Sequence, residues 1–305
     1  MIDTSFIIIV TYNGMPWLDT CLKSCVDYPV VVVDNGSTDE TVDYINKHFP
    51  KIIVLPQTEN KGFGQANNIG IRYALDQGAE QVFLLNQDAY LVSNVLDKLV
   101  QFQNMHQEYG ILSPVHITAD EKRLDYNFSG YMLRDRSNPF YSDFVLGNTL
   151  AAVYPVSFVN AAAWLISKHC LETVGGFDPL FFHYGEDDNY CQRVLFHGLK
   201  IGVVPKGYVI HDRADRVRSK VTEFSEHYYS KTLRIFKLKH SNLLNTDKHE
   251  KQISQLKKDI LKLKLQGKFK RAAQHQKTLM LMLAASPDIM RSREINIQKG
   301  KHYLY

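Results

Sequence analysis

Short, mainly apolar runs alternate with helix-like stretches along the first hundred residues of the chain. Four of these runs are five residues long and cover residues 6–10, 29–33, 51–55 and 81–85. Continuous apolar runs of this length indicate strands that are buried on both faces, as in parallel sheets. Strand and helix in alternation predict an α/β fold, in which helices flank a Rossmann-like, mostly parallel central sheet.

Other segments carry apolar residues at helical spacing, and their ends are read from caps and breakers. No clear pattern covers residues 101–156. The remaining predicted elements are a helix over 16–26, a helix that begins near Glu40 with Ser37 or Thr38 as its cap, a helix that follows Asn68 and runs through Ala74, helices over 171–176 and 186–196, and a strand over 201–204 that stops before Pro205.

Polar residues follow the first, second and fourth strands. They occupy positions 11–14, 34–39 and 86–88. Ligands of parallel sheets bind at the carboxyl ends of the strands, so these segments are the candidate ligand-binding turns. Asp88 is placed there to hold a hard divalent cation through oxygen, although a surface turn is the commoner place for an isolated aspartate.

Three consecutive carboxylates, Glu186, Asp187 and Asp188, stand at the start of a predicted helix. Acidic residues favour helix N-termini through the macrodipole, which is the structural explanation. The functional explanation is a general base whose pKa is raised by crowding, and the apolar segment 177–184 favours it because it could hold the carboxylates in a cleft. His211 could contact a metal or a phosphate, although a lone histidine is usually structural.

Composition places the chain among folded globular proteins, since 45% of its 305 residues are hydrophobic and 22% are charged. The net charge of +4 conceals a split. Residues 237–305 hold sixteen basic and five acidic residues, a net +11, which leaves −7 on the first 236 residues. This asymmetry indicates an acidic body with a basic tail that meets an anionic partner.

The four cysteines, Cys21, Cys25, Cys170 and Cys191, have neither zinc-ligand spacing nor the density of a disulfide framework. We therefore expect reduced, buried thiols in a cytosolic protein. The first residues lack a basic n-region and do not read as a signal peptide. No apolar run approaches the ~18 residues of a transmembrane helix.

The basic tail has the pattern of a helical hairpin. Ile253, Leu256, Ile260 and Leu263 recur at helix-packing spacing, Gly267 breaks the run, and a second helix is predicted over 269–285. Lysines crowd the junction between the two helices. Three interpretations stay open: an ordinary solvated helix face, docking to an anionic membrane surface, or self-association.

The ordered set of motifs is much more specific than any member of it. It resembles the family 2 nucleotide-sugar glycosyltransferases, which have a GT-A fold, over about residues 5–215. The form Asn86-Gln87-Asp88 and the segment 175–178 make it most similar to rhamnosyltransferase-type enzymes of bacterial polysaccharide assembly. The motifs lie, in chain order, at 11–13, 34–39, 60–70, 84–89, 175–178, 185–193 and His211.

The resemblance implies a catalytic domain over 1–220, with a donor half of about 1–100 and an acceptor half of about 101–220, and a basic helical extension over 221–305. It implies that Asp88, completed by His211, binds Mg²⁺ or Mn²⁺, and that Asp187 is the catalytic base with Glu186 beside it. Asn86 replaces the first carboxylate of the family's DxD motif, so metal affinity should depend on the bound nucleotide. The implied donor-binding residues are Thr11, Tyr12, Asn13, Asp34, Asn60, Gly62, Asn67, Gln87 and Asp88.

The implied activity is transfer of a sugar, with inversion, from a nucleotide diphosphate donor to a hydroxyl group in bacterial surface polysaccharide synthesis. The expected donor is dTDP-rhamnose or a UDP-sugar, and the expected acceptor is a glycan or a lipid-linked glycan. Such an enzyme would be cytoplasmic, with peripheral contact at the inner face of the membrane as one option.

Two other functions are weighed against this one. A nucleotidyltransferase usually has a glycine-rich loop with a basic residue after its first strand, where this chain has Thr11-Tyr12-Asn13-Gly14. A nucleic-acid-binding protein is suggested only by the basic tail, and it is the least favoured because the body is acidic and carries no recognisable binding motif.

Overall fold

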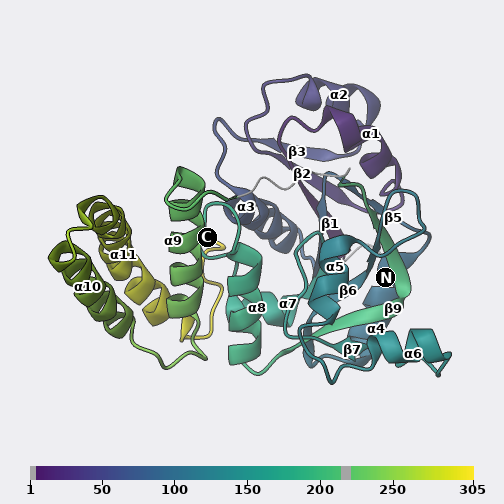
Figure 1. Ribbon diagram of the computed structural model, residues 1–305. Coiled ribbons are helices and arrows are strands. Elements are labelled where there is room, and N and C mark those ends of the chain that lie inside the picture. Colours follow the sequence, from purple (N-terminus) through teal and green to yellow (C-terminus); the bar gives the residue numbers. More distant parts are fainter. Residues whose placement is uncertain (1–4, 214–220) are drawn as a thin grey trace. The chain divides into compact units, whose positions relative to one another are not determined.

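The computed structural model describes residues 5–213 and 221–305. The chain divides into two compact units (Figure 1). Unit 1 comprises Met1–Arg216 together with Lys299–Tyr305, and unit 2 comprises Val217–Gln298. Residues 299–305, which the sequence analysis placed in the C-terminal extension, therefore pack with unit 1.

Unit 1 is built on a mixed sheet whose order in the described residues is β3-β2-β1-β4-β8-β6-β9-β5, with β7 on the edge of β9. The first four of these strands run parallel, β8 is antiparallel to β4 and β6, and β6 and β9 are again parallel. The predicted α/β class with a mostly parallel sheet is confirmed. The strands are β1 (Ser5–Thr11), β2 (Val30–Asp34), β3 (Ile53–Pro56), β4 (Gln81–Asn86), β5 (Ala89–Leu91), β6 (Tyr109–Ile117), β7 (Tyr154–Pro155), β8 (Ala163–Ser167) and β9 (Lys200–His211).

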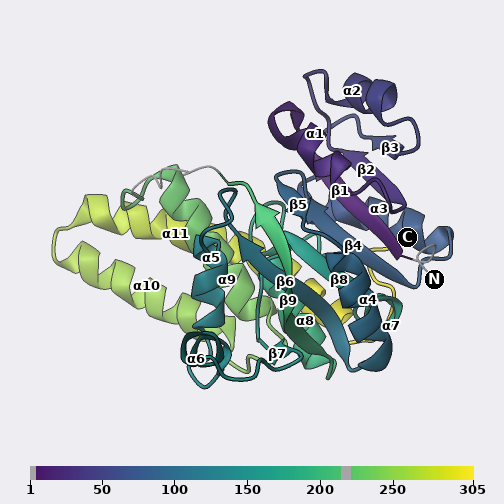
Figure 2. The same cartoon turned by 90° about the vertical axis from the view of Figure 1, so that its right-hand side faces the viewer.

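Helices cover both faces of this sheet (Figure 2). Side chains of β1 alternate between two apolar cores: Ile8 joins the core under α3, α7 and α8, whereas Ile7 and Ile9 join the core under α1, α2 and α4. This two-sided burial explains the continuous apolar run. The helices of unit 1 are α1 (Met15–Lys23), α2 (Thr41–His48), α3 (Phe63–Asp76), α4 (Val95–Met105), α5 (Tyr126–Met132), α6 (Phe140–Leu146), α7 (Lys168–Val174) and α8 (Glu186–Phe196).

Helix α2 begins at Thr41 with Glu40 as its N-cap residue, so the predicted start near Glu40 is confirmed. The predicted cap is wrong: neither Ser37 nor Thr38 caps the helix, and the Ser37 hydroxyl donates to Asp34 instead. The predicted start of the next helix, after Asn68, is wrong, because α3 begins at Phe63 and its first turns hold several Gly and Asn residues. Glycine is required inside α3 because a Cβ on Gly70 would lie 2.4 Å from the Ile8 side chain.

The predicted end of the last strand is also wrong, because β9 continues through Pro205 to His211. Its register with β6 jumps from Pro114↔Val204 to Val115↔Tyr208. The residues between these pairs bulge out of the ladder, which is where a sheet tolerates proline. This continuation carries His211 to the carboxyl edge of the sheet. The helix predicted over 171–176 lies at 168–174.

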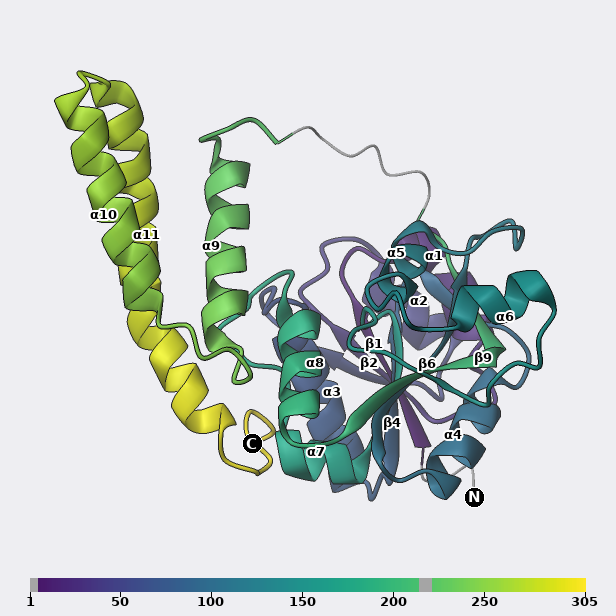
Figure 3. The ribbon, with the colours of Figure 1, turned by 60° about the horizontal axis from the view of Figure 1, so that its bottom comes forward.

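Unit 2 is helical and consists of α9 (Glu226–Ser241), α10 (His249–Leu265) and α11 (Phe269–Asn296). Figure 3 shows α10 and α11 side by side as an antiparallel pair. Gly267, with φ +68°, ends α10 as predicted. Helix α11 runs to Asn296 and so extends beyond the predicted end at residue 285.

All four cysteines are free and buried, as expected. Among the described residues, no helix is both long and apolar enough to cross a bilayer.

Candidate active site

The carboxyl ends of β1 and β2 form the first wall of the candidate site. Thr11 and Asp34 are register partners at these ends, and both are buried. The Asp34 carboxylate accepts hydrogen bonds from the Thr11 hydroxyl (3.2 Å), the Ser37 hydroxyl (2.5 Å) and the Ser37 N–H (3.1 Å). A carboxylate has about four acceptor positions, so one remains for a ligand hydroxyl or N–H group.

The loop after β1 is held from two sides. Asn13 has a left-handed φ of 49°, its N–H donates to the Ser37 hydroxyl (2.9 Å), and its Oδ1 accepts from the Thr38 N–H (2.9 Å). The side-chain amide of Gln87 accepts from the Tyr12 N–H (2.9 Å) and donates to the Tyr12 carbonyl (3.3 Å). Gln87 thus fixes the loop through its backbone and leaves the Tyr12 ring 46% exposed, free to face a ligand.

Asn60 organises the turn that leads into α3. Its Oδ1 accepts from the Gly62 N–H (2.9 Å) and from Asn35 Nδ2 (3.0 Å). Gly62 has φ +79°, and a Cβ there would lie 2.0 Å from the Phe182 carbonyl oxygen. Only glycine fits, because this turn is pressed against the segment that precedes α8. Asn67 is buried one turn further along and donates to the Phe63 carbonyl (3.0 Å).

Asp88 and His211 meet at the carboxyl edge of the sheet. The β5–β9 pairing puts Ala89 opposite His211, and the Asp212 N–H donates to the Asp88 carbonyl (2.7 Å). His211 Nε2 lies 3.5 Å from Asp88 Oδ1, and both residues are buried. Arg213 Nε lies 3.1 Å from His211 Nε2, the nitrogen that also faces Asp88, and 3.2 Å from Nδ1. The same Arg213 atom lies 3.6 Å from the Asp125 carboxylate.

This pair fits a hard divalent cation. Two ligands at right angles around Mg²⁺, with bonds of ~2.1 Å, lie about 3 Å apart, which is close to the observed separation. Asn86 Oδ1, at the end of β4, is buried without a hydrogen-bond partner among the described residues and offers an amide oxygen nearby in sequence. The described parts of the chain contain no group of three or more acidic, histidine or cysteine side chains that could hold a metal ion. A cation would therefore need further oxygens from amides, water or substrate.

Asp187 has the properties of a base. It lies in the first turn of α8, after Tyr184 and Gly185, which both have positive φ. Burial, followed by the charge of Asp188, raises the pKa of Asp187 to about 6. Asp188 itself pairs with Arg134 (Oδ1–Nη1 3.2 Å), whose guanidinium lies 4.0 Å from the centre of the Phe158 ring. The two neighbouring carboxylates thus differ, because Asp188 is ion-paired and Asp187 has a raised pKa.

The segment that carries Asp187 packs beside the turn that leads into α3. Gly62 touches the Phe182 backbone, and a Cβ on Gly64 would lie 3.5 Å from Cβ of Glu186. Glu186 is buried at this contact. The structure therefore brings residues 60–64 and 182–187 together, as a site with a donor and a base requires.

A turn at 175–178 supports α8 from behind. Asn68 pairs with the Phe177 backbone, accepting from its N–H (2.7 Å) and donating to its carbonyl (2.8 Å). The buried guanidinium of Arg193 donates to the carbonyls of Val174 (2.9 Å) and Gly176 (2.7 Å). These contacts hold the turn to α3 through Asn68 and to the last turn of α8 through Arg193.

The sequence interpretation missed Asn68, Arg134 and Arg193 as organisers of the site. It also missed Asn160, a buried residue whose Oδ1 has no hydrogen-bond partner among the described residues. Asn160 comes shortly before Ala162, whose carbonyl accepts a hydrogen bond from the Asn86 N–H. Asn68 and Arg193 lie inside recognised motifs and could have been noticed there. Arg134 and Asn160 lie outside them.

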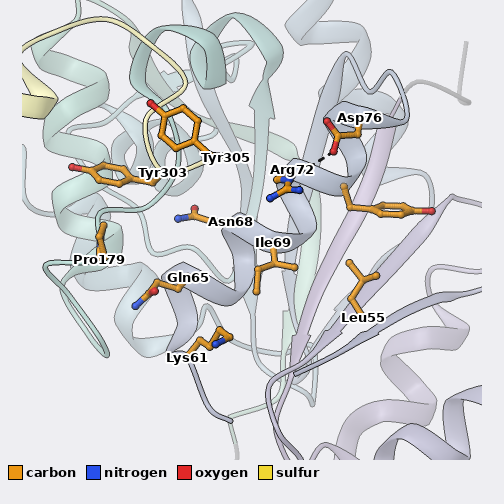
Figure 4. A pocket seen from close by; sticks show the side chains of 11 residues that line it. Leu55, Lys61, Gln65, Asn68, Ile69, Arg72, Asp76, Pro179, Tyr303 and Tyr305 are labelled. Carbon is orange, nitrogen blue, oxygen red and sulfur yellow. Dashed lines mark ion pairs between the residues drawn. The ribbon is translucent and has the colours of Figure 1, made fainter. Parts of the chain in front are cut away.

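A cavity of about 500 Å³ lies on the outer face of α3 (Figure 4). Lys61, Arg72 and the C-terminal residues Tyr303 and Tyr305 are among its lining residues. None of the predicted catalytic, metal or donor residues lines it, so it is separate from the candidate active site.

Comparison with solved structures identifies the fold. The crystal structure of GalNAc-T7 with UDP, GalNAc and Mn²⁺ matches with a TM-score of 0.55 at 18% identity; the match covers 77% of this chain and 47% of that one. The likeness shows the GT-A fold, which is a glycosyltransferase fold, and confirms the predicted architecture.

The chain belongs to glycosyl transferase family 2, whose sequence profile matches residues 6–162. A dTDP-rhamnosyl transferase of Shigella flexneri, RfbF, is 27% identical over 80% of each chain. An N-acetylglucosaminyl-diphospho-decaprenol L-rhamnosyltransferase of Mycobacterium tuberculosis is 26% identical over 75% of this chain and 83% of its own. The protein is a glycosyltransferase similar to rhamnosyltransferases, and this membership sets aside the nucleotidyltransferase and nucleic-acid-binding alternatives.

Proposed function

We propose that this glycosyltransferase moves rhamnose from dTDP-rhamnose to a hydroxyl of a glycan or lipid-linked glycan in surface polysaccharide assembly. The donor is inferred from the RfbF relative, and the lipid-linked acceptor from the decaprenol-dependent relative. A UDP-sugar is the alternative donor. The observation that carries the proposal is the pairing of a base of raised pKa, Asp187, with the Asp88–His211 cluster in one unit.

In this proposal Asp187 takes the proton from the acceptor hydroxyl. The acceptor oxygen then attacks the anomeric carbon from the face opposite the leaving diphosphate, so one C–O bond forms as the other breaks. A single displacement inverts the anomeric configuration and needs no carboxylate nucleophile, unlike retaining hydrolysis. A base with a pKa of about 6 is mostly ionised at neutral pH and still basic enough to accept the proton. Glu186 packs at the base of this site and positions Asp187.

Asp88 and His211 would hold Mg²⁺ or Mn²⁺, with Asn86 in the place of a second carboxylate. The cation, when bound, neutralises negative charge on the departing diphosphate. Mn²⁺ in the GalNAc-T7 structure supports a divalent cation. Because two protein ligands are too few, substrate oxygens would have to complete the coordination, and metal affinity would rise with nucleotide binding.

The donor would lie across residues 1–100 and the acceptor across about 101–220. Asp34 and the exposed Tyr12 ring would face the nucleotide. The other predicted donor-side residues act by shaping the backbone that the nucleotide meets: Thr11, Asn13, Asn60, Gly62, Asn67 and Gln87.

We further propose that the protein works at the inner face of the membrane and that residues 237–305 mediate peripheral contact or self-association. The net charge of +11 on this segment supports an anionic surface as the partner.

A donor panel tests the function. The full-length protein is incubated with Mn²⁺ and dTDP-rhamnose, UDP-hexoses or GDP-mannose, and the release of nucleoside diphosphate is measured with and without a lipid-linked acceptor. We expect acceptor-dependent release of dTDP. Release of UDP alone would move the donor to a UDP-sugar, and absence of any release with every donor would contradict the proposal.

A further inference from the structure

The junction between α10 and α11 combines exposed apolar and basic side chains. We call residues 257–271 the hairpin tip. Leu261, Leu265 and Phe269 are 59%, 81% and 68% exposed there. Side chains of this size are usually covered in a folded protein, so three of them at one turn mark a contact surface.

The packing of the hairpin does not need these three residues. Its buried apolar residues include Ile253, Ile260, Ala272 and Leu279, which lie on the inner faces of the two helices. Leu261 and Leu265 are one turn apart and so lie on one face of α10. The apolar residues of the tip are therefore additional to the fold of unit 2.

A short, hydrogen-bonded turn presents the tip. Gly267 adopts φ +68°, its N–H donates to the Lys264 carbonyl (3.0 Å), and the Lys268 N–H donates to the Leu263 carbonyl (2.9 Å). This is the usual way in which a glycine ends a helix. Leu265 and Phe269 stand on either side of this turn, and their positions are fixed by helical backbone rather than by a loose loop.

Positive charge surrounds the apolar residues. The tip holds seven basic residues and one acidic residue, a net +6. Of the seven, only Arg271 forms an ion pair among the described residues, with Glu223 at 3.4 Å. Lys268 donates to the neutral side-chain oxygen of Gln266 (3.0 Å), which leaves its charge uncompensated. No described carboxylate pairs with any of the six lysines, so these lysines can meet an external anion. They are Lys257, Lys258, Lys262, Lys264, Lys268 and Lys270.

We infer that the hairpin tip inserts into an anionic lipid surface. The three apolar side chains would enter the boundary between headgroups and acyl chains, while lysine stems lie along them and their ammonium groups reach the lipid phosphates. Pairing of the tips of two copies is a poorer alternative, because two tips of net +6 repel each other. The inference deepens the proposed membrane contact by naming the inserting residues, and it is independent of the identity of the donor sugar.

Vesicle flotation of the full-length protein tests this inference. Vesicles of phosphatidylcholine with phosphatidylglycerol are compared with vesicles of phosphatidylcholine alone, without donor or acceptor. We expect binding to the anionic vesicles only. The double variant Leu265→Ser/Phe269→Ser should bind at least ~100-fold more weakly, because each buried side chain of this size contributes more than a factor of ten.

Charge and control variants complete the test. Replacing Lys264, Lys268 and Lys270 by Gln should weaken binding about fivefold for each charge removed. The control is Leu244→Ser/Met290→Ser, which replaces residues of unit 2 that are 56% and 49% exposed but lie outside the tip. It should bind as the original protein does. Circular dichroism verifies the helix content of each variant.

Three results would overturn the inference. The first is no binding of the original protein to anionic vesicles, and the second is equal binding of the tip and control variants. The third is light scattering that shows a dimer for the original protein and the control variant but a monomer for the tip variant. Transfer to a soluble acceptor is measured in parallel. If the tip variant keeps both transfer and vesicle binding, only the inference about the tip is wrong. If the original protein shows no transfer, the proposed function is wrong.

Discussion

Two adjacent carboxylates in the first turn of α8 have different partners. Asp188 forms an ion pair with Arg134, while Asp187 has its pKa raised to about 6 by burial and by the Asp188 charge. Pairs of titratable groups with different environments commonly mark acid–base assignments. This difference supports the proposal that Asp187, rather than Asp188, is the base.

Replacing Asp187 by Asn should lower sugar transfer by ~10²–10⁴-fold, the usual loss on removal of a general base. Donor binding should change little, because the amide keeps the shape of the carboxylate. For the original protein, kcat/KM should fall about tenfold per pH unit below pH 6, where Asp187 takes up its proton. Steady-state kinetics against pH measure both effects. Asp188→Asn is the matched comparison, and near-normal turnover of the Asp187 variant would remove Asp187 from the role.

The same substitution should affect stability with a definite sign. The pKa of Asp187 is higher in the folded protein, at about 6, than its ordinary 3.8, so its stabilising contribution is present below pH 4 and is lost as pH rises through 6. Asp187→Asn should therefore raise the free energy of unfolding at pH 8 by about 1–3 kcal/mol and leave it nearly unchanged at pH 4. Urea denaturation at the two pH values measures this, and a gain of equal size at both would refute the shift.

The metal assignment predicts opposite effects for two substitutions. Asp88→Ala should abolish the enhancement of nucleotide binding by Mn²⁺, whereas Asn86→Asp should increase it about tenfold or more, since it supplies a second carboxylate beside the first. Isothermal titration calorimetry with dTDP, with and without Mn²⁺, measures both. Unchanged metal enhancement in Asp88→Ala would contradict the assignment.

At the level of single residues, the sequence indicated those that lie in recognised motifs. Asp88, His211 and Asp187 could be selected because each lies in a motif, and these motifs follow one another along the chain in the order that the family has. Arg134 could not be, because its contact with Asp188 spans 54 positions and starts in a segment without periodicity. Asn160 was missed because nothing local marks a polar residue that folding buries just before β8.

Among the elements, those with strong periodicity were predictable and those shaped by distant contacts were not. Helix α8 and the strands of the parallel sheet follow from local pattern. The start of α3 does not, because glycines at 64 and 70 look like loop residues until Phe177 and Ile8 are seen packed against them. The continuation of β9 past Pro205 depends on a bulge whose partner strand is far away in sequence.

The turn at 175–178 is supported by the last seven residues of the chain. The Gly176 N–H donates to the His302 carbonyl (2.7 Å), the Gly300 N–H donates to the Thr173 carbonyl (3.1 Å), and Lys301 pairs with Glu172 (3.2 Å). Leu304 is buried in the core that contains Phe177. Through the Gly176 carbonyl, which Arg193 binds, this support extends to α8.

Leu304→Ser should therefore loosen the turn without unfolding the protein. We expect faster hydrogen exchange at Gly176 and Gly300, and a fall in kcat of about tenfold or more, since small misplacement of a catalytic group is costly. Tyr305→Ser, at a side chain that is 84% exposed, is the matched control and should behave as the original protein does. Exchange at Gly176 that is the same in both variants would show that the tail does not hold the turn.

For the whole molecule, the charge split corresponds to the division of the chain into units. The sequence analysis expected the basic segment to be a separate helical extension that begins beyond the motifs. The course of the chain is different, because it leaves unit 1 near residue 216, forms unit 2, and returns to unit 1 at residue 299. Composition could not reveal this return, since seven residues with two lysines look like the rest of the basic tail.

This course of the chain predicts different outcomes for two deletions. Truncation after residue 216 removes unit 2 and also the segment 299–305 that supports the turn, so transfer to a soluble acceptor should fall at least as far as in Leu304→Ser. Replacing residues 221–298 by a Gly/Ser linker of about 20 residues, whose ends are typically ~25 Å apart, keeps that segment in the chain.

The linker variant should keep donor binding and transfer to a soluble acceptor within a few-fold of the original protein while losing vesicle binding. Assays of both activities on both deletions distinguish the two roles. If the linker variant loses soluble transfer as completely as the truncation does, unit 2 itself contributes to catalysis, and its assignment to membrane contact alone is wrong.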